Sequence, residues 1–200
     1  MRPRQAKNRK RWVDAVAVVA LFLALLVAVG GWLAWWSRQQ QLNLRLAAAL
    51  AKEDAVLTQR LLEQGADVRR RGSAGVTVLM VAAEKGDLSL AEQALRRGAP
   101  VDARDTRGAT ALMFASEAGE DDMAQLLMRH GADPNARNHI GWTPLMWAAN
   151  AGEVSVASLL LARGAERSAR SKRGDTALSL AKENGWTELV ELLQEGETRE

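Results

Sequence analysis

Glycines recur every 33 residues through most of this 200-residue chain, and they do so in three separate series. The three series are Gly75, Gly108, Gly141 and Gly174; Gly86, Gly119, Gly152 and Gly185; and Gly65, Gly98, Gly131 and Gly164. Threonine, leucine and alanine keep the same register: Thr77, Thr110, Thr143 and Thr176; Leu79, Leu112, Leu145 and Leu178; Ala82, Ala115, Ala148 and Ala181. Six series in one register predict a structural unit that cannot bury its apolar face alone and stacks on copies of itself.

The 33-residue period, with a core of the form Thr-Pro-Leu-x-x-Ala such as Thr143 to Ala148, resembles ankyrin repeats over about residues 42–193. The resemblance implies an all-α solenoid of about five helix-turn-helix repeats joined by β-turn loops, and a function in binding other proteins. The predicted ankyrin-repeat domain is 42–196, followed by a tail at 197–200, and its repeats are about 42–71, 72–104, 105–137, 138–170 and 171–196.

The side chains at the repeat landmarks predict local structure. Each threonine hydroxyl is expected to accept a hydrogen bond from a free backbone N–H at the start of the first helix. In the first repeat Glu53 stands where the later repeats have glycine. This irregular unit is therefore predicted to be a terminal cap, in which truncation of Leu46 costs less than truncation of an interior leucine.

The N-terminal part of the chain predicts a membrane anchor. Residues 15–36 carry no charge, which predicts one transmembrane helix in contact with the lipid bilayer, between a basic segment at 1–14 and a short linker at 37–41. Six cations precede the apolar stretch within the first 11 residues, and two follow it within 15. This bias predicts a cytoplasmic N-terminus and a periplasmic repeat domain at a bacterial inner membrane.

The same N-terminal segment is compatible with a cleaved secretory signal. Ala28-Val29-Gly30 matches the small-residue pattern of a signal-peptide cleavage site. The alternative function is therefore an exported soluble inhibitor, of the kind of an immunity protein, whereas the first interpretation is a membrane-tethered scaffold or inhibitor of an envelope protein.

Charge and composition argue against other classes of function. The first 14 residues carry a net charge of +5 and the remainder a net charge of −2, which together give the formal net charge of +3, so no nucleic-acid partner is expected. The chain has no cysteine and only two histidines, which leaves no convincing catalytic set, metal site or cofactor site. The prediction is a protein without enzymatic activity, cofactor or small-molecule substrate, whose partner is an unidentified protein.

In ankyrin-repeat proteins the partner is held by the turn tips and the exposed face of the first helices. The register places the following candidates there: Trp142, Arg107, Ile140, Arg173, Asp175, Glu84, Lys85, Glu117 and Asn150. Trp142 is the strongest candidate because tryptophan is enriched at binding hot spots. Its alternative role is to pack on the turn, as it does in many such repeats.

Arginine forms a further 33-residue series, one residue at each turn: Arg71, Arg104, Arg137 and Arg170. This series is a candidate for contacting an acidic protein segment or anionic headgroups. The alternative is a structural role, since a cation at this point of the turn is common in the family.

Overall fold

The computed structural model describes the backbone of residues 3–195, and in the first helix it describes side chains only at residue 25 and from residue 27 onward. Residues 1, 2 and 196–200, which include the predicted tail, lie outside the described residues. Every regular element described is a helix. The elements are α1 Pro3–Ala51, α2 Ala55–Glu63, the 3-10 helix η1 Ser73–Gly75, α3 Val78–Glu84, α4 Leu88–Arg96, α5 Ala111–Ala118, α6 Asp121–Arg129, α7 Pro144–Ala151, α8 Val154–Ala162, α9 Ala177–Glu183 and α10 Thr187–Gln194.

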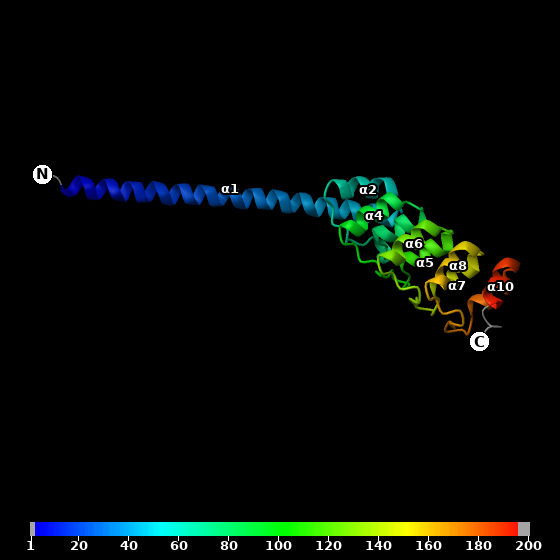
Figure 1. Cartoon of the computed structure of the whole chain (residues 1–200). Helices are drawn as coiled ribbons and strands as arrows, with labels where there is room; N and C mark the ends of the chain where they lie inside the picture. Colours follow the sequence, from blue (N-terminus) through cyan, green and yellow to red (C-terminus); the bar gives the residue numbers. More distant parts are fainter. Residues whose placement is uncertain (1–2, 196–200) are drawn as a thin grey trace. The chain divides into compact units, whose positions relative to one another are not determined.

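From Asn43 onward the chain forms one compact unit in which pairs of helices follow one another (Figure 1). Each of the four later repeats holds one pair: α3 with α4, α5 with α6, α7 with α8, and α9 with α10. The first helices of successive pairs contact each other, as do α4 with α6, α6 with α8 and α8 with α10. The first helices therefore form one row and the second helices form another. In the chain, each turn tip precedes the first helix of its repeat.

The first helices begin at threonines, largely as predicted. The hydroxyls of Thr77, Thr143 and Thr176 accept hydrogen bonds from the backbone N–H groups three residues later, at 3.3, 3.4 and 3.1 Å. Thr110 differs, because its buried Oγ1 has no hydrogen-bond partner among the described residues. The cap therefore forms in three of the four repeats.

The leucine series fills the core of the stack. Leu79, Leu112 and Leu145 are fully buried, whereas Leu178 in the last pair is only half-buried. Leu46 is also fully buried, together with Leu50. The end of α1 therefore contributes core residues to the first repeat, and this burial argues against the expected low cost of truncating Leu46.

The predicted transmembrane helix over residues 15–36 is also wrong. No helix among the described residues is long and apolar enough to cross a membrane. The side chains of residues 15–24 and 26 lie outside the described part.

From Ser37 onward α1 continues through polar residues, so the predicted linker 37–41 is helical. The predicted single-pass inner-membrane localisation, with a periplasmic repeat domain, conflicts with the same finding and is corrected with it. The basis for the predicted bilayer contact is removed as well.

Glu53 occupies the position at which the register calls for glycine, and its φ is +53°. A side chain in this left-handed conformation costs about 1 kcal/mol relative to glycine, which adopts it freely. We therefore expect Glu53→Gly to raise the free energy of unfolding by up to about 1 kcal/mol, measured by urea denaturation of the full chain. Glu63→Gly, a change in the last residue of α2, should instead destabilise, and a loss of stability in both variants would contradict the explanation.

Candidate protein-binding groove

The turn tips of neighbouring repeats are joined by backbone hydrogen bonds. Ala74 O accepts from Thr106 N at 2.8 Å, Arg107 O from His139 N at 2.9 Å, and Ile140 O from Lys172 N at 3.0 Å. Gly141 lies at one of these contacts, where its φ is +85° and an added Cβ would lie only 3.0 Å from Lys172 N. The tips therefore form a continuous edge with fixed spacing.

Three of the tips are closed by a short polar side chain at their first position, where the second repeat has Gly72. Asp105 Oδ1 accepts from Arg107 N and Ala109 N, and Asn138 Oδ1 accepts from Ile140 N and Trp142 N. In the last repeat Ser171 Oγ accepts from Arg173 N and Asp175 N. The sequence analysis did not identify this role, although Asp105, Asn138 and Ser171 also stand 33 residues apart.

A pocket of about 450 Å³ lies between the tips and first helices of the third and fourth repeats. Five of its lining residues were predicted from the register: Arg107, Glu117, Ile140, Trp142 and Asn150. The other four were not: Thr106, Asn138, His139 and Trp147. The structure therefore brings together one part of the predicted groove, at a single repeat junction.

The apolar wall of the pocket is aromatic. Trp147 lies 5.9 Å from Phe114 between ring centroids, with the rings tilted by 48°. Trp142 is half-buried and packs against the same cluster, which includes Ala109 and Met113. Trp142 therefore both supports the turn and lines the pocket.

Trp147 is nine-tenths buried, and its Nε1 donor has no hydrogen-bond partner among the described residues. A buried unpaired donor costs free energy that a suitable acceptor would recover. In the sequence, Trp147 stands one residue before Ala148 of the alanine series, where the other repeats have Val81, Phe114 and Leu180. This register position was the sequence signal that could have identified Trp147 as a residue of the groove.

Of the two charged residues Arg107 and Glu117 at the pocket, Arg107 has an ion-pair partner in the described chain and Glu117 does not. Arg107 Nε donates to the buried Asp105 Oδ2 at 3.0 Å, and its guanidinium lies over the Phe114 ring at 5.7 Å from the centroid. Glu117, which also lines the pocket, makes no ion pair within the described chain. Burial raises the pKa of Glu117, the nearby Arg107 lowers it, and Glu84 raises it further.

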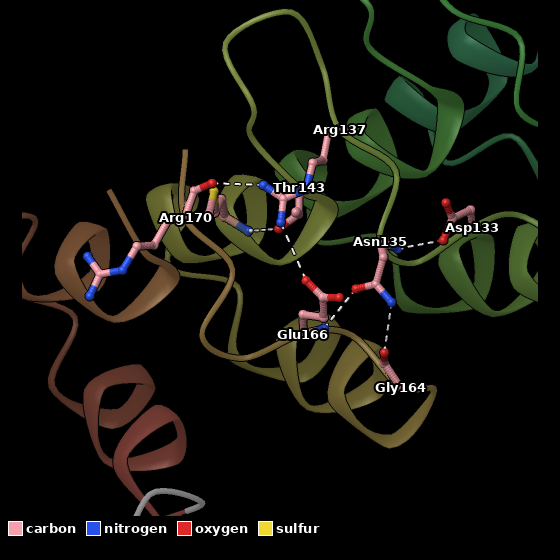
Figure 2. Close-up of polar contacts among 8 residues, drawn as sticks. Asp133, Asn135, Arg137, Thr143, Gly164, Glu166 and Arg170 are labelled. Atoms are coloured by element: carbon pink, nitrogen blue, oxygen red, sulfur yellow. Dashed lines mark hydrogen bonds and ion pairs between the residues drawn. The ribbon is translucent and has the colours of Figure 1, made fainter. Parts of the chain in front are cut away.

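The arginine series has a structural role. Arg71 Nη1 donates to Arg104 O at 2.7 Å, Arg104 Nη1 to Arg137 O at 2.6 Å, and Arg137 Nη1 to Arg170 O at 2.8 Å. Figure 2 shows Arg137 reaching Arg170, with Glu166 as an ion-pair partner at 3.4 Å. None of the four arginines lines the pocket, and each of the first three links its repeat to the next one.

Asn135 adds a second link beside this one, also visible in Figure 2. Its amide nitrogen donates to Gly164 O at 2.9 Å, and its Oδ1 accepts from Glu166 N at 2.8 Å. In the preceding repeat Asp102 accepts from Asp133 N in the same way, at 3.2 Å. These bonds use side chains of the turns to fix neighbouring repeats.

The remaining predicted residues lie outside the pocket. Glu84 pairs with Lys85 at 3.3 Å, and Asp175 Oδ2 accepts from Ser171 Oγ at 2.8 Å. Arg173 is exposed on the last tip.

No group of three or more histidines, cysteines or acidic residues is placed to hold a metal ion within the described residues. The family model for ankyrin repeats (3 copies) matches residues 44–138 and 131–199. No curated protein matches the chain. Two rows of helices, the 33-residue register and this match, which spans most of the sequence, lead to one conclusion: the chain belongs to the ankyrin-repeat family and contains a protein–protein interaction module.

Proposed function

We propose that this protein is a non-catalytic scaffold or inhibitor that holds its partner protein in the groove between the third and fourth repeats. The observation that carries the proposal is the pocket of about 450 Å³ with Trp142, Trp147 and Ile140 on its wall. Concave sites lined by aromatic residues, with a few polar groups at the rim, are typical binding sites.

The rigidity of the site supports the same proposal. The tips on both sides of the pocket are held by the backbone bond between His139 N and Arg107 O and by the side chains of Asp105 and Asn138. A preorganised surface loses little conformational entropy on binding, so more of the contact energy appears as affinity. Ile140 is exposed beside the pocket, where it adds apolar area for a partner.

Site-specific photocrosslinking tests the proposal. A benzophenone side chain placed at Ile140 should crosslink a partner in cells of the source organism, and the crosslinked protein is then identified by mass spectrometry. The matched control is Val56 on α2, which is also an exposed apolar residue but lies away from the pocket.

The purified partner should then bind the full chain in a one-to-one complex without being chemically altered. A partner that crosslinks equally well from positions 56 and 140, or that is converted to a product, would contradict the proposal.

A further inference from the structure

We infer that the pocket between the third and fourth repeats receives a basic side chain of the partner, a lysine or an arginine. The aliphatic stem of that side chain would lie against Trp142 and Ile140, and its cation would meet the Glu117 carboxylate. The inference rests on the proposed function, because it names the chemistry that the same groove selects.

The pairing of charges around the pocket is the first argument. Arg107 is already bound to Asp105, whose side chain is almost completely buried, and Lys85 is bound to Glu84. Glu117 is left as the carboxylate at the pocket without an ion pair in the described chain. A cation supplied by a partner would pair with this carboxylate.

The environment of Glu117 is the second argument. Glu117 is exposed to solvent on one side, and partial burial is the largest cause of its raised pKa, so its ionised form is somewhat less stable here than in water. Arg107 partly offsets this effect, and Glu84 adds to it. A partner cation would stabilise the ionised carboxylate and so lower the pKa of Glu117 again.

The aromatic wall is the third argument. Two indoles line the pocket, and tryptophan faces attract lysine and arginine cations more strongly than other aromatic rings do. Long basic side chains also carry an apolar stem that covers indole surface while the charged end stays hydrated.

An acidic side chain is the competing occupant, because Arg107 and His139 also line the pocket. Arg107 is less available to a partner than Glu117, because the Arg107 guanidinium is paired with Asp105 and lies over the Phe114 ring. Carboxylate binding would also place a second anion near Glu117 and Glu84. The charges therefore favour the basic occupant.

The test is a titration of the full chain with short peptides, followed by NMR of the tryptophan indole N–H signals. The probes are acetyl-Ala-Ala-X-Ala-Ala-amide peptides in which X is lysine, arginine, norleucine or glutamate. Norleucine matches the stem of lysine without its charge. Trp142→Phe and Trp147→Phe assign the two pocket signals.

Lysine and arginine peptides should shift both signals with dissociation constants in the millimolar range, as expected for one side chain, and about tenfold below that of the norleucine peptide. Glu117→Gln should remove the preference over norleucine. The control Glu183→Gln, at the same register position in the last repeat, should keep it. The carboxyl carbon signal of Glu117 should also report a lower pKa when the lysine peptide is bound.

Three results would overturn the inference: equal binding of the norleucine and lysine peptides, tightest binding of the glutamate peptide, or an unchanged lysine preference in Glu117→Gln. Absence of saturable shifts up to about 20 mM lysine peptide would overturn it as well. Failure of the proposed function looks different, because crosslinking from Ile140 would then recover no specific partner. A partner that crosslinks at Ile140 but binds without a basic preference would refute only the inference.

Discussion

Leu112→Ala or Leu145→Ala is expected to lower the free energy of unfolding by about 2 to 5 kcal/mol. Both side chains are fully buried between first helices that have a packed neighbour on each side. Truncation removes apolar contacts and leaves a cavity that these neighbours fill only in part. Because the stability of a repeat array is a sum over neighbouring units, the loss should reduce cooperativity along the stack as well.

Urea denaturation of the full chain, followed by circular dichroism, measures this loss, and two other leucines provide the comparison. Leu178→Ala should cost less, because Leu178 is only half-buried in the last pair of helices. Leu46→Ala should cost about as much as the interior changes, since Leu46 is fully buried. Equal losses at Leu178 and Leu145 would show that burial does not determine the cost in this stack.

Trp142→Ala is expected to weaken partner binding by about 2 kcal/mol or more, which is roughly a 30-fold rise in Kd. Trp142 lines the pocket and contributes the large, rigid apolar surface that is typical of binding hot spots. Its backbone is held by Asn138, so the position of the turn should survive the substitution. Calorimetry with the partner identified by crosslinking measures the change.

Arg173→Ala is the matched control, since Arg173 is exposed on another tip and lies outside the pocket. Its effect on affinity should be small, as for a charge at the rim of an interface. Trp142 also packs against Met113 and Trp147, so a thermal melt is needed to count folded molecules. A sharply lower melting temperature with unchanged affinity per folded molecule would show that Trp142 only packs the turn.

Much of the fold follows from the sequence because a repeat shows its own register. The family was correctly identified from the glycine, threonine and leucine series, since each position recurs with one physical cause. The register also predicted five of the residues that line the pocket, including Arg107 and Trp142. Their membership in a binding site stays a prediction.

Other features were not accessible in the same way. The register gives the position of Trp147, but its unpaired donor depends on which groups pack around it. The arginine bonds between repeats were weighed only as one alternative, because sequence spacing does not show which acceptor a guanidinium reaches. The predicted membrane span, which was inferred from the uncharged, apolar run 15–36 and the cations before it, is not supported by any helix of the described residues.

The arginine bonds give the array a direction. Each bond runs from an arginine at the end of one repeat to the carbonyl of the arginine at the end of the next, whereas Arg170 donates to Gly174 O, four residues further along the same turn, at 3.2 Å. A 33-residue unit therefore brings with it one donor and one acceptor. Lengthening the protein by duplicating an internal unit, such as 105–137, would leave every one of these bonds satisfied. A further repeat added after Gln194 would offer Arg170 a new acceptor only if Arg170 first gave up its bond to Gly174 O. The two ends of the solenoid are therefore not equivalent for evolution or for engineering.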